Sequence, residues 1–476
     1  MIFPTIDFAV FFAVVFGVSW LLLRRPRAWK IFILLASYFF YGYWDWRFIG
    51  LIAGASVVNH LAAVGMHRSR NPHVRRTLLV LACVFNLGSI GFFKYARFLA
   101  EQAMLLCHLL GLPLDFWLPV LDYLGQVILP VGISFFTFQA LSYVIDVYRR
   151  VMEPADSLLD FACYLAFFPQ LVAGPIVRAV DLLPQVSRPQ WPAAIDLSRA
   201  GSLILGGLFK KIVIANFLAA AIVDPVFARP DAYGAWDTLW AVYGYAIQIY
   251  CDFSAYSDIA IGLCLLLGFK IPLNFDAPYL AGSIQDFWRR WHISLSSFLR
   301  DYLYIPMGGS RGRSGRTYRN LLVTFLLGGL WHGAGWTFIA WGALHGIYLS
   351  LERALGWGQD RPDAAWGGRI LRRVVVWHLV CLSWLFFRGQ SFGHALDMLR
   401  ALGQWSAPVQ RATPLVLVIA AIGYLSQLLD GERAARLWQA VSRLPAWAQG
   451  ALAAVGLTII LGLGPKGVAA FIYFQF

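Results

Sequence analysis

The stretch LLGGLWHGAGWTFIAWGALHG, residues 326–346, contains no Asp, Glu, Lys or Arg, and the wider segment from Leu321 to Ile347 is uncharged as well. Uncharged runs of about 18 or more mostly apolar residues are typical of membrane-embedded helices. Polar side chains inside such segments are costly and usually have a function. The run therefore predicts a membrane segment, and it makes His332 and His345 candidate functional residues.

The composition of the chain excludes a soluble globular protein. Of its 476 residues 59% are apolar and only 13% are charged, whereas soluble domains have about 45–50% apolar and roughly 25% charged residues. The net charge of +14 would suggest nucleic-acid binding in a soluble protein. Here the basic residues gather in short loops between apolar runs, as in the cytoplasmic loops of membrane proteins. We predict an all-α polytopic membrane protein that contacts lipids and does not bind nucleic acid.

Two basic loops near the N-terminus predict the orientation of the chain. The apolar run Ile2–Leu23 is followed directly by RRPRAWK. A cleaved signal peptide has its basic residues before the apolar part, so this run is predicted to be a first membrane helix. The next two apolar runs, joined by the turn WDWR, lead to a second basic loop, HRSRNPHVRR. Both loops are predicted on the cytoplasmic side, with the N-terminus on the opposite side.

The remaining apolar runs predict one helical bundle. We expect about 10–13 membrane helices, in a single domain over residues 1–476 with its catalytic core at about 125–350. Runs broken by Pro or Gly, such as FFPQLVAGPIVR, are expected to be re-entrant or half helices. The six cysteines have no paired Cys or His spacing, so neither a disulfide framework nor a metal site is predicted.

The segment 270–319 is the most informative polar stretch. From Gln285 to Arg319 it has seven arginines against two aspartates, which predicts a position at the cytoplasmic interface. Ser283, three residues before Asp286, is expected to cap a helix. We expect one amphipathic helix. Its apolar face is predicted to carry Trp288, His292, Leu295, Leu299 and Leu303, with the histidine directed inward.

The arginines of this helix have two interpretations. Arg289, Arg290 and Arg300 either contact lipid headgroups and set the topology, or bind the phosphates of a cytosolic donor through bidentate hydrogen bonds. The rings of Trp288 and Trp331 are further candidates for donor binding.

Two carboxylates lie in another apolar stretch. Asp252 and Asp258 are the only charged residues between Thr238 and Phe269. Carboxylates inside a membrane cost about 2.5–3.5 kcal/mol on insertion scales and need partners. They either pair with a nearby Arg or helix terminus as structural groups, or line a polar chamber or ion path.

Three classes of function remain open from the residues alone. The first is a membrane-embedded acyl- or group-transferase with His332 and His292 as its catalytic pair, since imidazole is suited to act as a base near neutral pH. The second is a secondary transporter that uses the two aspartates, although no internal symmetry of the kind found in transporters is visible. The third is a scaffold. His345 lies roughly 220° from His332 around a continuous helix, so we expect it to face elsewhere as a packed residue.

The two histidine blocks resemble those of a known family. DFWRRWHISLSSFLRDYLYIPMGG (286–309), followed by the stretch 326–346, is similar to the membrane-bound O-acyltransferase superfamily. Within it, the chain resembles the integral-membrane subunit of bacterial polysaccharide O-acetylation systems, of which the alginate type is the best known. The likeness covers most of the chain and includes SYFFYGYWDWRF, LPVGISFFTFQALSYVIDVYRR, IYCDFSAYSDIAIGLCLLLGF and the final FIYFQF.

This resemblance implies a helical bundle around a central tunnel, with His332 at the family's invariant histidine and His292 at its second position. It implies acetyl-CoA as the donor and no tightly bound cofactor. The acetyl group would cross the bacterial inner membrane, with the N-terminus in the periplasm, for O-acetylation of an extracytoplasmic polysaccharide such as alginate. Peptidoglycan or another cell-surface polymer is the alternative acceptor. A periplasmic acetyltransferase of the SGNH-hydrolase type is the implied partner. The acetyl group would reach the polysaccharide either directly or through this partner.

Overall fold

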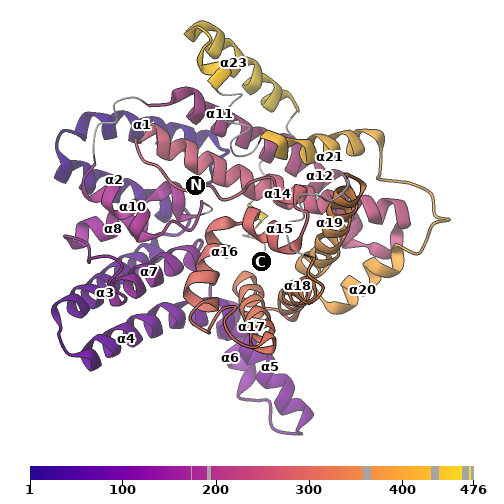
Figure 1. The fold of residues 1–476 in the computed structure, drawn as a ribbon, viewed down its shortest axis with the longest axis horizontal. Helices are drawn as coiled ribbons and strands as arrows, with labels where there is room; N and C mark the ends of the chain where they lie inside the picture. Colours follow the sequence, from indigo (N-terminus) through magenta and orange to yellow (C-terminus); the bar gives the residue numbers. More distant parts are fainter. Residues whose placement is uncertain (173, 190–194, 358–365, 430–438, 464–470, 473–476) are drawn as a thin grey trace. The chain divides into compact units, whose positions relative to one another are not determined.

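A computed structural model describes residues 1–172, 174–189, 195–357, 366–429, 439–463 and 471–472, and these residues form helices and connecting segments without any strand (Figure 1). The all-α class predicted from the apolar runs is confirmed. The chain divides into two compact units by its internal contacts. Contact density alone does not define a domain, so the single domain over residues 1–476 stays a prediction.

The first unit contains residues 6–193 and 267–271, together with Met1. Sequence signals begin several of its helices: Pro26 occupies the first turn of α2, and the side chain of Asn71 accepts a hydrogen bond from the N–H of His73 at the start of α4. The described helices of this unit are α1 (Ile6–Leu22), α2 (Pro26–Gly42), η1 (Trp46–Phe48), α3 (Ile49–Arg68), α4 (Pro72–Ile90), η2 (Gly91–Tyr95), α5 (Ala96–Leu109), α6 (Trp117–Gly125), α7 (Ile133–Tyr148), α8 (Leu158–Ala166), α9 (Phe168–Leu171) and α10 (Ala179–Ser187).

The second unit contains residues 2–5, 194–266 and 272–476. Its long helix α14 packs against α11, α19 and α21 and is mostly buried. The described helices of this unit are α11 (Leu197–Leu208), η3 (Phe209–Ala215), α12 (Asn216–Leu218), η4 (Ala219–Val223), α13 (Asp224–Ala228), η5 (Pro230–Ala232), α14 (Ala235–Leu266), η6 (Pro278–Leu280), α15 (Ile284–Arg290), α16 (Ile293–Leu299), η7 (Arg300–Tyr304), α17 (Ser314–His332), α18 (Trp336–Ala354), α19 (Trp366–Arg388), α20 (Phe392–Ala401), α21 (Pro414–Ser426), η8 (Gln427–Leu429) and α23 (Ala446–Leu463).

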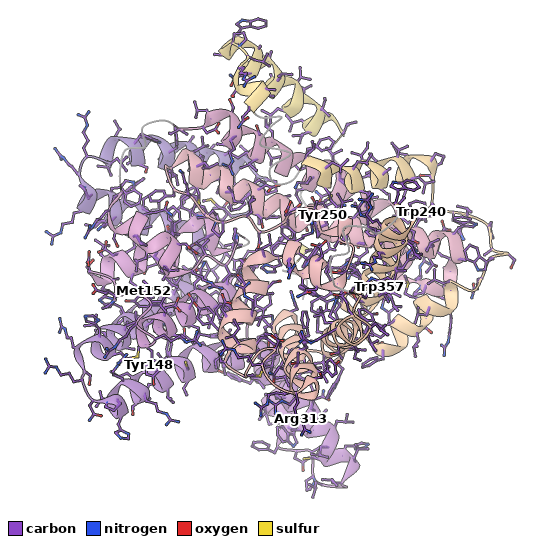
Figure 2. The ribbon with its side chains drawn as sticks, in the orientation of Figure 1. Tyr148, Met152, Trp240, Tyr250, Arg313 and Trp357 are labelled. Atoms are coloured by element: carbon purple, nitrogen blue, oxygen red, sulfur yellow. The ribbon has the colours of Figure 1, made fainter. Side chains whose placement is uncertain are left out.

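Six helices among the described residues are long and apolar enough to cross a membrane. Three shorter apolar helices accompany them, at Ile6–Leu22, Ile133–Tyr148 and Pro414–Leu429. Figure 2 shows the side chains that these helices carry, and many large apolar side chains are exposed, as expected for surfaces that face lipid. The six long helices are Trp46–Arg68, Pro72–Leu109, Leu197–Ala228, Ala235–Leu266, Trp366–Arg388 and Ala446–Leu463.

The uncharged run from Leu321 to Ile347 forms two helices rather than one. Helix α17 ends at His332, and α18 begins at Trp336, because the backbone is extended at Gly333 and at Gly335. The two helices pack closely against each other. The premise of one continuous helix, from which we expected His345 to face elsewhere, is therefore wrong. His345 is nonetheless a buried residue, and it is not among the residues that line the same pocket as His332.

The predicted amphipathic helix after Ser283 is also interrupted. Ser283 caps α15 as expected, accepting a hydrogen bond of 3.0 Å from the N–H of Asp286. The helix ends at Arg290, and His292 adopts a left-handed conformation with a φ of 43° before α16 begins. Such a φ is uncommon for a residue with a side chain. The single helix predicted from the apolar spacing is therefore wrong, because a backbone turn at His292 separates two short helices.

The C-terminal motif FIYFQF is described only at Phe471 and Ile472, which are both buried. The N–H of Ile472 donates a hydrogen bond of 2.9 Å to Asp252, and the ring of Phe471 lies 4.4 Å from that of Tyr256. The remainder of this motif and Ala173 within FFPQLVAGPIVR lie outside the described residues.

Candidate active site

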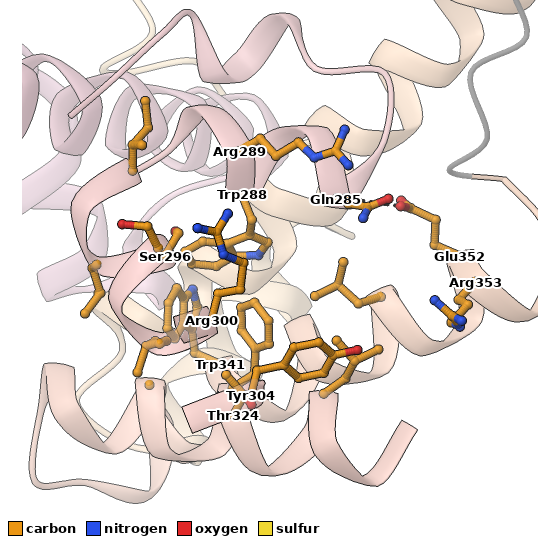
Figure 3. Close-up of a pocket in the computed structure, with 18 of the residues that line it drawn as sticks. Gln285, Trp288, Arg289, Ser296, Arg300, Tyr304, Thr324, Trp341, Glu352 and Arg353 are labelled. Carbon is orange, nitrogen blue, oxygen red and sulfur yellow. Dashed lines mark hydrogen bonds between the residues drawn. The ribbon is translucent and has the colours of Figure 1, made fainter. Parts of the chain in front are cut away.

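A pocket of about 680 Å³ lies within the second unit, between α15, α16, α17 and α18. Figure 3 shows the arginine side chains of α15 and η7 and the indole of Trp288 around this space, with Glu352 and Arg353 of α18 across from them. His332 also lines the pocket. The hairpin formed by α17 and α18, together with the short helices α15 and α16 before it, therefore brings one histidine, several arginines and aromatic rings to one cavity.

His332 occupies the last position of α17 and is 4% exposed. Its ring contacts three aromatic neighbours: Trp331 at 4.9 Å, Trp341 at 5.0 Å and Phe387 at 5.2 Å between ring centroids. Edge-on contacts with several rings fix the orientation of an imidazole. The structure therefore places His332 as a buried, oriented imidazole at the pocket wall.

Two glycines allow the helices of the hairpin to approach each other near His332. A Cβ atom on Gly329 would lie 2.2 Å from the carbonyl oxygen of Phe338, and one on Gly342 would lie 2.1 Å from that of Phe325. No larger residue fits at these positions without moving the backbone. Close packing through small residues is common between membrane helices, and here it holds α18 against the end of α17.

His292 is fully buried, and it does not line the pocket, although its neighbour Ile293 does. Its Nδ1 lies 3.2 Å from Oδ1 of Asn274. That oxygen also accepts hydrogen bonds from the backbone N–H of Ser294 at 3.2 Å and from its hydroxyl at 2.8 Å. An atom that accepts from a backbone N–H is the amide oxygen, so Nδ1 of His292 is the donor. In the neutral ring, Nε2 then carries the lone pair.

Trp331 contacts both histidines. Its ring centroid lies 4.9 Å from that of His332 and 6.1 Å from that of His292. His292 also packs edge-on against Phe253 at 4.6 Å. The two histidines predicted from sequence thus belong to one aromatic cluster, but only His332 is exposed to the pocket.

The candidate arginines separate into two groups. Arg289 and Arg300 line the pocket, and the structure adds Arg353, which sequence analysis did not single out. Arg300 also forms an ion pair of 2.6 Å with Asp301. Arg290 is not among the lining residues; it pairs with Asp286 at 2.8 Å, one turn before it on α15.

Glu352 is a further residue that sequence analysis missed. It is 8% exposed, and its carboxylate accepts hydrogen bonds from the backbone N–H groups of Ile284 at 2.5 Å and Gln285 at 3.1 Å. These groups form the N-terminus of α15, where backbone N–H groups favour a negative charge. Glu352 therefore fastens α15 to α18 across the pocket. Its place as the first charged residue after the uncharged stretch is the signal by which the sequence could have indicated it.

Asp252 and Asp258 are both neutralised by lysines. Asp252 forms an ion pair of 2.9 Å with Lys211, and Asp258 one of 2.6 Å with Lys210. The ammonium of Lys210 also lies 5.5 Å from the ring centroid of Tyr250, which is labelled in Figure 2. Neither aspartate lines the pocket. Buried ions in such pairs offset one another's charge.

Metal-binding side chains do not gather in the described part of the chain. Among those residues no group of three or more His, Cys, Asp or Glu side chains has an arrangement that could hold a metal ion.

A multi-pass all-α membrane protein with a buried histidine in the wall of an arginine-bearing pocket has the features of a membrane-embedded acyltransferase. Residues 155–382, which include both histidines, match the model of the membrane-bound O-acyltransferase family. The chain belongs to this family and is an acyltransferase.

The relatives of the chain include proteins that are named for acyl transfer to different polymers. It is 41% identical over 414 residues to a probable alginate O-acetylase of Azotobacter vinelandii, and the matched region covers 85% of this chain and 79% of that protein. It is 37% identical over 405 residues to a peptidoglycan O-acetyltransferase of Helicobacter pylori, covering 80% and 74%. It is 29% identical over 286 residues to a teichoic acid D-alanyltransferase of Streptococcus thermophilus, covering 54% and 68%. The resemblance of the histidine blocks to this family is confirmed.

Proposed function

We propose that the protein takes acetyl groups from acetyl-CoA on the cytoplasmic side and passes them across the bacterial inner membrane for O-acetylation of an extracytoplasmic polysaccharide such as alginate. The observation that carries this proposal is the presence of His332 in the wall of a pocket that also bears Arg289, Arg300 and Arg353. A single cavity thus offers a base for the reacting hydroxyl and cations for the phosphates of the donor.

The proposed reaction transfers an acyl group from sulfur to oxygen. His332 takes the proton of the acceptor hydroxyl while the hydroxyl oxygen forms a bond to the thioester carbonyl carbon. Collapse of the tetrahedral intermediate breaks the carbon–sulfur bond. The thiolate of coenzyme A leaves and receives the proton from the imidazolium. Atoms balance without a metal or an oxidant, and the imidazole returns to its starting state.

The remaining site residues are proposed to hold the donor. The guanidinium groups that line the pocket suit phosphate oxygens because they present several N–H donors in a plane. Trp288 lies on the pocket wall and Trp331 lies against both histidines. His292, held by Asn274 inside the protein, is proposed to orient this aromatic wall or to stabilise the developing oxyanion.

The orientation in the membrane and the partner follow from the same proposal. The basic residues in the loops after the first and third helices support a cytoplasmic position of these loops, and we propose that the N-terminus lies in the periplasm. The acceptor hydroxyl belongs either to the polysaccharide or to a protein that delivers the acetyl group, for which a periplasmic SGNH-type acetyltransferase is our proposed partner. No tightly bound cofactor is part of this mechanism.

Peptidoglycan is the second candidate acceptor, because the relative from Helicobacter pylori is a peptidoglycan O-acetyltransferase at 37% identity. The same chemistry would serve both polymers. Transport through Asp252 and Asp258 has less support, since each aspartate pairs with a lysine.

The proposal is tested with purified protein in proteoliposomes that receive radiolabelled acetyl-CoA on one side. We expect release of coenzyme A and transfer of label to an acceptor on the opposite side. His332→Ala should lower the rate by about 10²–10⁴-fold, which is the contribution of a positioned base. His73→Ala is the matched control, because His73 is an exposed histidine at the start of α4.

Two results would contradict the proposal. Near-normal transfer by His332→Ala would remove this histidine from the chemistry. Movement of protons or a solute without consumption of acetyl-CoA would favour the transporter. Chemical analysis of alginate and peptidoglycan from cells with and without the gene distinguishes the two acceptors.

A further inference from the structure

His345 joins a chain of hydrogen bonds that leads to the pocket wall. The indole Nε1–H of Trp288 donates to Nδ1 of His345 at 3.2 Å. Nε2 of His345 lies 2.9 Å from the hydroxyl oxygen of Ser383, and this hydroxyl donates to the carbonyl of Val380 at 2.7 Å. His345 and Ser383 are both completely buried.

The donor and acceptor at each step of this chain are fixed by chemistry. An indole nitrogen only donates and a carbonyl oxygen only accepts. Nδ1 of His345 must therefore carry a lone pair, and the single ring proton resides on Nε2, which donates to Ser383. The ring is neutral and has one tautomer. A doubly protonated ring would place two N–H donors against each other at Trp288.

The held residue, Trp288, forms part of the pocket. Its ring packs edge-on against Phe325 at 4.9 Å, Trp341 at 5.7 Å and His345 at 5.0 Å. These contacts restrict the ring laterally, and the hydrogen bond to His345 fixes which edge of the indole turns inward. Figure 3 shows Trp288 on the same side of the cavity as Arg289 and Arg300.

We propose that His345 is a positioning residue that fixes the indole of Trp288 in the wall of the donor pocket through its bond to Trp288 and its anchor on Ser383. The statement that the pocket binds the acetyl donor rests on the proposed function, whereas the bond between His345 and Trp288 does not depend on it. His345 lies behind the wall, does not line the pocket and takes no part in proton transfer. It acts on the reaction through the position of the indole.

Two pairs of substitutions distinguish the contribution of Nδ1 of His345, which accepts from Trp288, from that of Nε2, which donates to Ser383. In His345→Asn the amide oxygen is attached to Cγ, as Nδ1 is, so it can still accept from Trp288. His345→Leu has the same branching without an acceptor and is its matched control. In His345→Gln the amide nitrogen corresponds to Nε2, so the anchor on Ser383 is kept and the acceptor for the indole is lost. Ser383→Ala removes the anchor alone.

The first measurement does not depend on catalysis. Protein labelled with 5-fluorotryptophan gives a fluorine NMR spectrum in detergent, in which the Trp288 signal is identified by its absence in Trp288→Phe. We expect this signal to shift in His345→Leu and His345→Gln and to remain near its original position in His345→Asn. The same position in all three variants would overturn the proposal, and so would an equal shift in all three, since a loss of packing alone affects them alike.

The second measurement uses acetyl-CoA turnover. We expect His345→Leu to raise the KM for acetyl-CoA by about 10-fold, as for a tenfold loss of affinity, with kcat changed much less. His345→Asn should restore most of this loss. The effects of His345→Leu and Trp288→Phe should not add in the double variant, because both remove the same interaction. Additive effects, or a fall in kcat alone, would contradict the positioning role.

The two measurements distinguish the inference from the proposed function. If the wild-type protein does not turn over acetyl-CoA, the proposed function fails, while the fluorine spectra still report whether His345 fixes Trp288. If turnover is normal and the Trp288 signal does not respond to His345, the positioning role fails alone.

Discussion

Oδ1 of Asn274 lies 3.2 Å from Nδ1 of His292 and determines which nitrogen of that ring carries the proton. Asn274 is itself held by the hydroxyl of Ser257, which accepts from its amide nitrogen at 3.1 Å. The polar environment of His292 therefore comes from a loop and from α14, although the residue was singled out for its place in a helical pattern.

Asn274→Leu should lower turnover by about 10-fold or more, because His292 would lose the bond that sets its tautomer and orientation. The backbone N–H of Ser294 would lose its acceptor as well, and a buried unsatisfied donor costs about 1–3 kcal/mol. Turnover and thermal unfolding in detergent measure both effects. Asn86→Leu is the control, since Asn86 pairs with Asn59 in the first unit. If both variants reduce turnover equally at equal stability, the role of Asn274 is structural only.

The free energy of unfolding should fall at acidic pH, because His292 stays unprotonated in the folded protein and becomes protonated in the unfolded chain. Burial lowers the pKa of His292 to about 3, whereas an unfolded histidine titrates near about 6.5. Between these two pH values the unfolded chain binds more protons than the folded protein does. The contribution of His292 to the free energy of unfolding is therefore fully present above pH ~6.5 and is lost progressively toward pH ~3. This residue should contribute a loss of about 2 kcal/mol between about pH 7 and pH 5.

The melting temperature at these two pH values, measured for the wild type and for His292→Asn, tests this contribution. The variant lacks the titrating ring and should lose less stability on acidification. Identical losses in both proteins would show that other groups cause the acid sensitivity.

Gly329→Ala and Gly342→Ala should each destabilise the protein by at least about 1–3 kcal/mol. The added methyl group would meet a backbone carbonyl at 2.2 Å or 2.1 Å, so the hairpin of α17 and α18 must open. Gly54→Ala is the matched control, because nothing lies within 4 Å of a Cβ at that position of α3. There the better helix propensity of alanine should leave stability unchanged or raise it by up to about 1 kcal/mol. Thermal unfolding measures all three, and tolerance of alanine at Gly329 would contradict the close approach.

Arg289→Gln should raise the KM for acetyl-CoA by about 10-fold with little change in kcat, because the lost interaction is with a part of the donor that does not react. Arg290→Gln serves as the control on the adjacent residue, which pairs with Asp286 away from the pocket lining. Its effect on KM should be much smaller. An equal effect of both variants, or none of either, would favour the interpretation of these arginines as headgroup contacts.

The sequence itself determined the class of the protein and several local features. The length of the uncharged runs, their aromatic content and the basic loops are properties of composition, and a membrane requires helices from such segments. The cap at Ser283 also follows from local chemistry, since the hydroxyl and the N–H that it accepts are three residues apart. The two histidine blocks were sufficient for the family.

Only the tertiary structure decided how the histidines relate to their surroundings. At His292 the backbone turns where Asn274, 18 residues earlier in the chain, accepts hydrogen bonds from the His292 ring and from the N–H of Ser294. A periodic pattern contains no information on such a partner, so the spacing predicted one helix where there are two.

The same reason explains His345 and the lysine–aspartate pairs. The stretch 326–346 shows no break in its apolar pattern, yet two extended glycines fold it back on itself and bring His345 to Trp288. Lys210 and Lys211 meet Asp258 and Asp252 from a different helix. Contacts between segments that are distant in sequence depend on packing, and packing is decided by shape and charge in three dimensions.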